Sequence, residues 1–256
     1  MSEELKIALI QSHLLWENPE ANRQLFADKI EGIPDDVDMI VLPEMFTTGF
    51  TMQPESIPFK EKEKTVEWMQ DWAQKKDVAL VGSIVNPEAQ KYYNRLWFVA
   101  PNGTWTYDKK HTFTLAGEDK VYKAGTIKQI ISFRGFNICT MICYDLRFPV
   151  WARNSEDYDA LLYVANWPKP RIEAWDTLLK ARAIENMAYC IGVNRVGLDG
   201  EGHEYSGHSA VYDVLGNQMV YSEKEEILYT SLSKDYVQET RKKLKFLDDR
   251  DAFNLL

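Results

Sequence analysis

The sequence predicts an α/β fold in which two β-sheets pack face to face and helices cover their outer faces. Short apolar runs alternate with segments of helical periodicity along the chain, which is typical of βα units. Pairs of strands joined by tight turns lie beside these units, at Pro101-Asn102-Gly103 and at Gly216-Asn217. Together the two patterns indicate a sandwich of two sheets between helices.

The N-terminal half is predicted to hold two helices and five strands. Asn18 followed by Pro19 is a helix start, and this helix runs to about Ile30. A continuous apolar run at residues 38–42 ends at Pro43-Glu44, as expected for a strand that is buried on both faces. The second helix is expected at residues 62–76, and the other strands at residues 6–11, 78–85, 93–100 and 104–107.

The C-terminal half is predicted to continue the same pattern without a linker or repeat. One long helix is expected at residues 171–187, and the strands at residues 130–133, 136–142, 159–165, 189–196, 210–214 and 218–221. The last segment, about residues 235–256, is charged with scattered Leu and Phe. Because this tail cannot form a core alone, we expect it to pack on the domain or on a partner subunit. Residues 1–256 are therefore predicted to be a single domain.

Charge and hydropathy exclude several classes of protein. The formal net charge is −9 and the pI is about 5.1, which disfavours nonspecific binding of nucleic acid. No apolar run approaches the roughly 18 residues of a membrane span. The first residues are acidic where a signal peptide is basic and then apolar. We expect a cytoplasmic protein that binds neither nucleic acid nor membrane.

The chain has three cysteines, Cys139, Cys143 and Cys190. An odd number at these separations does not indicate a disulfide framework, and the spacing is poor for a zinc site, so no metal site is predicted. Cys139 and Cys190 lie inside apolar runs and are interpreted as small core residues. Cys143 differs because it stands at the end of a predicted strand.

Three reactive side chains follow predicted strands directly: Glu44, Lys109 and Cys143. Each has a simpler interpretation, as a solvated carboxylate, a surface lysine and a core thiol. In α/β folds, however, ligands bind in the crevice beyond the carboxyl ends of strands. Three such ends can bring a thiol, a carboxylate and an ammonium into one pocket, and this joint pattern favours a catalytic site.

Five segments in a fixed order strengthen that interpretation. They are Leu42-Pro43-Glu44, Tyr107-Asp108-Lys109-Lys110-His111, Cys143-Tyr144-Asp145-Leu146-Arg147-Phe148-Pro149, Ala165-Asn166-Trp167-Pro168 and Leu179 to Asn186. With them the chain resembles, over essentially its whole length, the carbon–nitrogen hydrolases of the nitrilase superfamily. The resemblance implies a four-layer αββα sandwich, a homodimer, and no metal or organic cofactor.

The resemblance also implies catalytic roles. The family's triad corresponds to Glu44, Lys109 and Cys143, and its second glutamate most closely matches Glu118. Glu44 takes the proton of the Cys143 thiol, and the thiolate attacks an amide carbon. Glu44 later gives a proton to the departing ammonia. Lys109 and the backbone N–H of Tyr144 stabilise the oxyanion. Water activated by Glu44 or Glu118 then hydrolyses the thioester.

Four further side chains are considered at this site. Trp167 is expected to form a pocket wall and Phe113 a lid. Arg147 is interpreted either as a ligand of a substrate carboxylate or as a partner of Asp145 or another acid that braces the nucleophile turn. His111 suggests an alternative Cys–His pair, but its place two residues after Lys109 favours a structural role.

The residues after the nucleophile narrow the expected substrate. True nitrilases resemble Cys-Trp-Glu here, whereas this chain has Cys143-Tyr144-Asp145, which favours amides over nitriles. The motifs look most like those of omega-amidases, which hydrolyse the terminal amide of 2-oxoglutaramate or 2-oxosuccinamate. Two alternatives stay open: another amidase of the superfamily, such as a carbamoyl-amino-acid or deaminated-glutathione hydrolase, and a noncatalytic binding or assembly module with the same fold.

Overall fold

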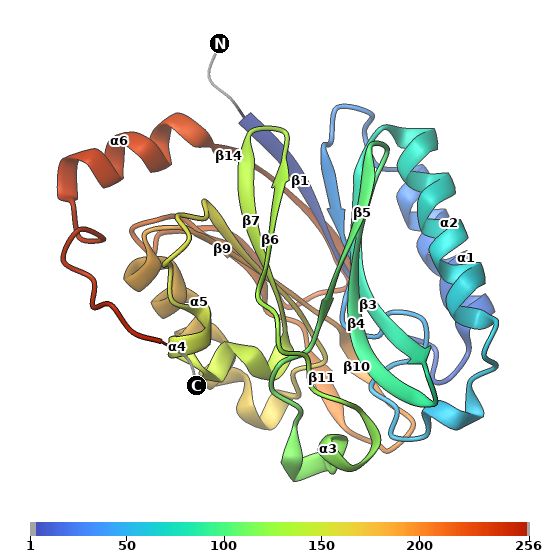
Figure 1. The fold of residues 1–256 in the computed structure, drawn as a ribbon. Helices are drawn as coiled ribbons and strands as arrows, with labels where there is room; N and C mark the ends of the chain where they lie inside the picture. The colour runs from blue at the N-terminus through green and yellow to red at the C-terminus, as the bar shows by residue number, and fades with distance from the viewer. Residues whose placement is uncertain (1–3, 255–256) are drawn as a thin grey trace.

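The computed structural model describes residues 4–254 and shows two β-sheets packed face to face between two layers of helices (Figure 1). Helices α1 (Pro19–Glu31) and α2 (Glu61–Lys76) cover the outer face of one sheet. Helices α4 (Pro149–Ala152) and α5 (Ile172–Asn186) cover the outer face of the other. The layer order is α, β, β, α, and it confirms the predicted fold class.

The first sheet has the strand order β14-β1-β2-β3-β4-β5. Its central strands β1, β2 and β3 run parallel, and the outer pairs are antiparallel. The parallel strands are nearly continuous apolar runs because helices or the second sheet cover both of their faces. The bounds are β1 Glu4–Gln11, β2 Met39–Val41, β3 Ala79–Glu88, β4 Lys91–Ala100, β5 Gly103–Asp108 and β14 Glu226–Ser233.

The second sheet has the strand order β13-β12-β9-β8-β7-β6 and the same plan, with parallel strands β7, β8 and β9 at its centre. Because parallel neighbours point their carboxyl ends the same way, the loops after β7 and β8 leave the sheet at one edge. The bounds are β6 Gln129–Phe133, β7 Phe136–Ile142, β8 Ala160–Ala165, β9 Tyr189–Asn194, β12 Ser209–Tyr212 and β13 Gln218–Ser222.

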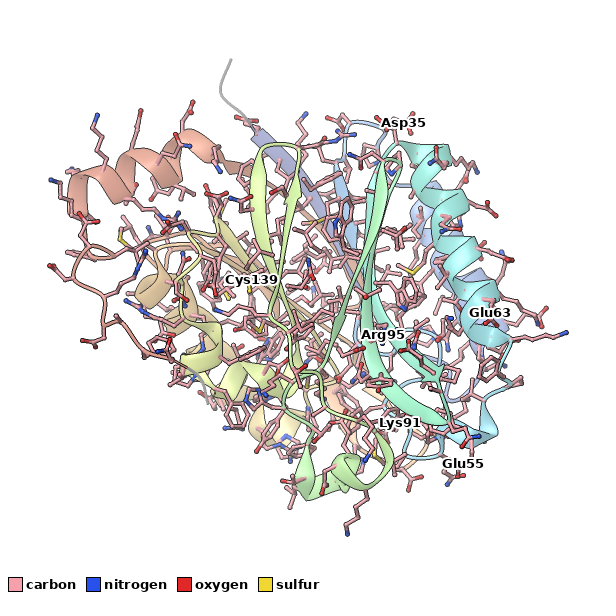
Figure 2. All side chains as sticks on the ribbon, viewed as in Figure 1. Asp35, Glu55, Glu63, Lys91, Arg95 and Cys139 are labelled. Atoms are coloured by element: carbon pink, nitrogen blue, oxygen red, sulfur yellow. The ribbon has the colours of Figure 1, made fainter. Side chains whose placement is uncertain are left out.

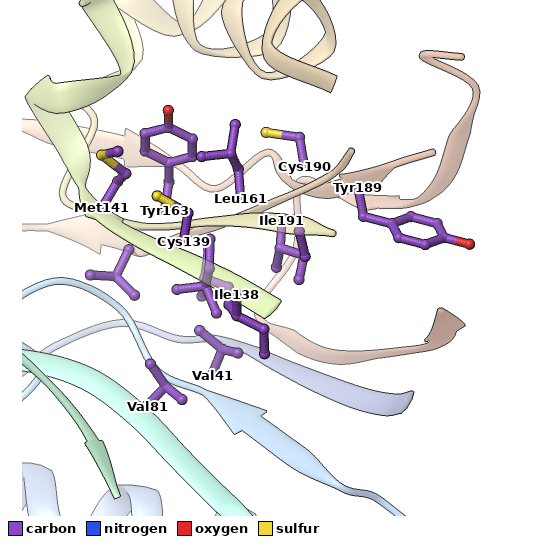
Figure 3. Close-up of a cluster of buried hydrophobic side chains, with 14 of the residues drawn as sticks. Val41, Val81, Ile138, Cys139, Met141, Leu161, Tyr163, Tyr189, Cys190 and Ile191 are labelled. Carbon is purple, nitrogen blue, oxygen red and sulfur yellow. The ribbon is translucent and has the colours of Figure 1, made fainter. Parts of the chain in front are cut away.

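The inner faces of the two sheets form the main hydrophobic core. Val41 and Val81 of the first sheet face Ile138 and Ile191 of the second (Figure 3). Strand residues alternate between faces, so Cys139, Met141, Leu161, Tyr163 and Cys190 point away from the first sheet, towards the helical layer. Cys139 and Cys190 are completely buried there, as expected for core thiols.

Three C-terminal elements were not predicted. Strands β10 (Val196–Leu198) and β11 (Glu204–Ser206) form a small two-stranded sheet. After β13 the chain returns to the first sheet, where β14 pairs with β1 along its whole length. Helix α6 (Lys234–Leu244) forms the first part of the charged tail and packs on its own chain. Its Val237 is fully buried, and Arg241 donates to the carbonyls of Met187 (2.8 Å) and Tyr158 (2.6 Å).

Charged side chains lie mainly on the outside of the sandwich. Asp35, Glu63 and Lys91 project from its surface, whereas Cys139 lies within it (Figure 2). Within residues 4–254, no helix is both long enough and apolar enough to cross a membrane.

The remaining short elements connect these layers. Three of them, η2, α3 and η3, border the site described next. The bounds are η1 Pro54–Ser56, η2 Thr114–Ala116, α3 Glu118–Val121, η3 Cys143–Arg147 and η4 Lys169–Arg171.

Candidate active site

Glu44 is fully buried three residues after β2. The turn that carries it is tied to β3, because the Met45 N–H donates to the Ser83 hydroxyl (2.9 Å) and the Phe46 N–H to the Ser83 carbonyl (3.1 Å). Met45 has a left-handed backbone conformation with φ of 44°, which costs free energy in a non-glycine residue and is typical of functional turns. This turn directs the carboxylate of Glu44 into the protein rather than into solvent.

Lys109 follows β5 and is also fully buried. Its backbone N–H donates to the Asn94 carbonyl (3.0 Å), and its own carbonyl accepts from the Gly125 N–H (2.8 Å). The Lys109 Nζ atom lies 2.9 Å from Glu44 Oε1 and 2.9 Å from Glu118 Oε2. It also lies 3.1 Å from Glu118 Oε1, so both oxygens of Glu118 and one oxygen of Glu44 surround the ammonium.

Cys143 stands at the end of β7, where the chain enters the turn η3. Its φ is 43°, so the nucleophile candidate itself adopts a strained, left-handed conformation. The thiol lies 3.9 Å from the Asn166 carbonyl oxygen, at the end of the neighbouring strand β8. The residue is only 8% exposed, so the sulfur meets solvent only through the pocket.

Glu118, at the start of α3, is fully buried beside Lys109. Its Oε2 accepts the Phe113 N–H at 2.5 Å as well as the Lys109 ammonium. The loop that carries Phe113 is therefore bonded to the same carboxylate that contacts Lys109.

The charges in this cluster act on one another. Burial raises the pKa of the Cys143 thiol well above its ordinary value, the Glu44 carboxylate raises it further, and Lys109 opposes both. Burial lowers the pKa of Lys109, but Glu118 and Glu44 outweigh burial, so that this pKa is raised and the ammonium stays protonated. Burial raises the pKa of Glu118 against the opposing effect of Lys109. The resting sulfur is thus a neutral thiol that needs a base to react.

A pocket of about 450 Å³ opens onto Cys143 and Lys109. Tyr144, Trp167, Phe113 and Arg147 line it, as do these two residues. The Phe113 and Tyr144 rings meet edge to face with centroids 4.9 Å apart. The structure therefore brings the predicted residues together: two glutamates behind the ammonium, and the other six on the pocket walls.

Arg147 does not brace the nucleophile turn as one of the two interpretations proposed. Its guanidinium lies over the Trp167 ring, 4.8 Å from the centroid, and forms no ion pair with any residue between 4 and 254. Asp145 instead accepts hydrogen bonds from Tyr107 Oη (2.7 Å) and from the His111 backbone and ring nitrogens (2.9 and 2.7 Å). The bracing interpretation is wrong because Asp145 points away from the pocket, into the loop after β5.

The hydrogen bonds to Asp145 hold His111 in the loop after β5. Its ring also stacks on Phe148 with centroids 3.7 Å apart and an interplanar angle of 6°. These contacts support a structural role for His111 over the alternative Cys–His pair.

Several site residues were missed by sequence reasoning. The Asn166 backbone N–H donates to Glu44 Oε2 (2.7 Å), and Asn94 Nδ2 donates to Glu44 Oε1 (2.7 Å). Arg171 lies over the Phe113 ring, 5.2 Å from its centroid. Asn166 follows a strand directly, a signal that was available, whereas Asn94 lies inside a strand where no local pattern marks it. The other unpredicted pocket residues include Trp16, Glu17, Asp199, Glu201, His203 and Tyr205.

A buried thiol and an ammonium at the floor of one pocket, with two carboxylates behind the ammonium, are typical of an enzyme that uses a cysteine nucleophile. Comparison with known proteins agrees with this class. The sequence profile of the carbon–nitrogen hydrolase family matches residues 6–242. The chain belongs to this family, and it is a hydrolase of carbon–nitrogen bonds other than peptide bonds.

Individual relatives span the whole chain. Omega-amidase YafV from Yersinia enterocolitica is 43% identical over 255 residues, covering 98% of this chain and 99% of that protein. The 2-oxoglutaramate amidase of Bacillus subtilis is 29% identical over 250 residues, covering 95% and 96%. The solved structure of a CN-hydrolase superfamily protein from Xanthomonas campestris, with an arsenic adduct in its active site, is 36% identical with a TM-score of 0.96, covering 99% of both chains.

Proposed function

We propose that the protein is a cysteine-dependent omega-amidase that hydrolyses the terminal carboxamide of a small 2-oxo diacid monoamide, 2-oxoglutaramate or 2-oxosuccinamate, to the diacid and ammonia. The observation that carries the proposal is the division of the pocket. The thiol and the ammonium lie at its floor, and two guanidinium groups, Arg147 and Arg171, line its walls. Each guanidinium stacks on a pocket aromatic ring.

The two arginines favour a substrate with a carboxylate. Neither forms an ion pair within the described part of the chain, residues 4–254, so both have donors for an anion in the pocket. A guanidinium binds a carboxylate with two parallel hydrogen bonds, and its stacking on Trp167 or Phe113 fixes the plane in which it does so. A short diacid monoamide has its carboxylate at one end and its amide at the other. The names of two relatives, omega-amidase and 2-oxoglutaramate amidase, support the same class of substrate.

The first half of the reaction uses the cluster at the floor. Glu44 accepts the Cys143 proton as the sulfur attacks the amide carbon, which suits a resting thiol whose pKa is raised by burial and by that same carboxylate. The charge of the Lys109 ammonium and a hydrogen bond from the Tyr144 backbone N–H stabilise the oxyanion that forms. Glu44 returns a proton to the nitrogen, and ammonia leaves as the thioester forms.

In the second half a water molecule hydrolyses the thioester. Glu44 or Glu118 removes a proton from the water. The water oxygen bonds to the acyl carbon, and the carbon–sulfur bond breaks. The proton then returns to the Cys143 sulfur, and the free diacid leaves. Glu118 also holds the Phe113 N–H, so the pocket lid and the ammonium share one anchor.

Ammonia release from a panel of substrates tests the proposal. We expect turnover of 2-oxoglutaramate or 2-oxosuccinamate to exceed that of succinamate, of carbamoyl amino acids and of a nitrile. Preference for a carbamoyl amino acid would select the alternative hydrolase, and absence of ammonia from every amide would select the noncatalytic module. The homodimer and the cytoplasmic location stay predictions; light scattering of the purified protein tests the first and cell fractionation the second.

A further inference from the structure

Asn94 lies at the centre of the buried charge cluster without having been assigned any role. It belongs to β4 and is 1% exposed. Its Nδ2 donates to Glu44 Oε1 at 2.7 Å and lies 3.3 Å from Glu118 Oε1, so a single amide bridges the two carboxylates. Its backbone carbonyl accepts the Lys109 N–H at 3.0 Å. Asn94 therefore contacts both carboxylates through its side chain and the Lys109 backbone through its own carbonyl.

The cluster needs such a bridge because its charges do not balance. Two buried carboxylates share one ammonium, and like charges at short range favour protonation of one of them. The Lys109 Nζ atom contacts the same two oxygens as the amide does, Glu44 Oε1 (2.9 Å) and Glu118 Oε1 (3.1 Å). A neutral N–H donor lowers the cost of keeping both carboxylates ionised without adding a charge.

The other end of the Asn94 side chain supports a role directed at the carboxylates. Its Oδ1 is buried and has no hydrogen-bond partner within residues 4–254. A buried carbonyl without a partner costs free energy. If Asn94 served only for packing, its replacement by an apolar residue of similar shape would stabilise the protein. The reverse orientation of the amide would point Oδ1 at two carboxylate oxygens and is repulsive.

We propose that Asn94 is a positioning residue for the base of the reaction: by bridging Glu44 to Glu118, it stabilises the negative charge of the carboxylate pair and orients Glu44 towards the Cys143 thiol. The inference rests on the role of Glu44 in the proposed function. It predicts that loss of the bridge makes the carboxylate pair bind a proton more tightly. The acidic limb of the pH–rate profile then moves to higher pH.

Four other groups face the pair and enter this pH dependence. Lys109 opposes protonation of the carboxylates from the end of β5, and Cys143 lies across from them on η3. The Tyr122 phenol interacts with both carboxylates and the Tyr205 phenol with Glu44, and burial is the main cause that raises the pKa of each phenol. Both phenols therefore stay neutral over the neutral range, so the acidic limb reports on the carboxylates.

The test replaces Asn94 and follows two pH profiles. Asn94→Leu removes the donor and keeps the same branched arrangement of heavy atoms. Asn94→Ser keeps a shorter donor in a smaller side chain, so the test still works if the first variant fails to fold. The first profile is kcat/KM for 2-oxoglutaramate, and the second is the rate at which iodoacetamide alkylates Cys143. Asn86→Leu is the matched control, because Asn86 is a buried asparagine on the adjacent strand β3 whose two polar side-chain atoms have no partner within residues 4–254.

We expect the acidic limb of both profiles to move up by about 0.5 to 1 pH unit in Asn94→Leu, and by less in Asn94→Ser. We expect kcat to fall about tenfold or more at pH 7 with a smaller change in KM, and the profiles of Asn86→Leu to stay in place. Lower rates in both Asn94 variants with an unmoved acidic limb would overturn the inference. If wild type releases no ammonia but the alkylation profile shifts, the proposed substrate is wrong and the inference on Asn94 stands.

Discussion

Replacing Lys109 by methionine removes the ammonium but keeps most of the side-chain volume. In the wild type this ammonium is fully buried and lies 2.9 Å from an oxygen of each glutamate. Removing one partner of a buried ion pair costs about 3 to 5 kcal/mol of stability, because the other charge is left uncompensated. Catalysis is affected separately. Loss of one oxyanion donor costs ~2.7 to 4 kcal/mol of transition-state stabilisation, a factor of about 10² to 10³ in kcat.

The stability change should depend on pH, with a definite sign. Burial and the Glu44 carboxylate raise the pKa of Glu118 in the folded state, and loss of the opposing Lys109 ammonium raises it further above that of the unfolded chain. The folded state then binds a proton more readily, so the free energy of unfolding of the variant rises as the pH falls from 8 towards 5. The wild type shows less of this change, because the Lys109 ammonium stays protonated over that range and opposes protonation of Glu118.

Urea unfolding at pH 5 and pH 8, with ammonia release measured at pH 7, checks both expectations. Lys110→Met is the control, because the Lys110 ammonium lies over the Trp151 ring, 5.2 Å from the centroid, and outside the cluster. Two results would refute the reasoning: a deficit in stability that is equal at both pH values, or a loss confined to KM with kcat unchanged. The second would make Lys109 a substrate-binding residue.

Three further predictions concern the nucleophile, the carboxylate subsite and the backbone. Cys143→Ala should abolish ammonia release while the circular dichroism spectrum and unfolding midpoint stay close to wild type; unaltered turnover would mean that the nucleophile is wrong. Arg147→Ala should raise KM for 2-oxoglutaramate about tenfold or more but leave KM for an uncharged amide unchanged, as steady-state kinetics with both substrates will show. Gly125→Ala should lower both stability and activity, because an added Cβ would lie 2.2 Å from the Asp108 carbonyl oxygen. The control Gly32→Ala should retain both, because its added Cβ would have its nearest contact at 3.7 Å. Thermal unfolding and ammonia release measure the two properties.

Much of the fold could be predicted because its strands are short, apolar and bounded by turn residues. The expected strand at residues 136–142 is β7 (Phe136–Ile142), and the expected helix at 62–76 is α2 (Glu61–Lys76). The elements that were missed have weaker local signals. β14 (Glu226–Ser233) alternates polar and apolar residues beside a charged turn, and its pairing with β1 joins opposite ends of the chain. Such a long-range pairing depends on the whole sheet, so local periodicity does not indicate it.

For the site, the sequence by itself determined which residues carry reactive groups and that three of them follow strands. Glu44, Lys109 and Cys143 could be selected in this way because a strand end is a local feature. The tertiary structure alone decided how these groups are connected. It directed Asp145 to His111 rather than to Arg147, left two guanidinium groups facing the pocket, and placed Asn94 between the glutamates. These contacts join residues up to 122 positions apart, as between Glu44 and Asn166. Side-chain direction and burial at such separations follow from the packing of the two sheets, which no local pattern encodes.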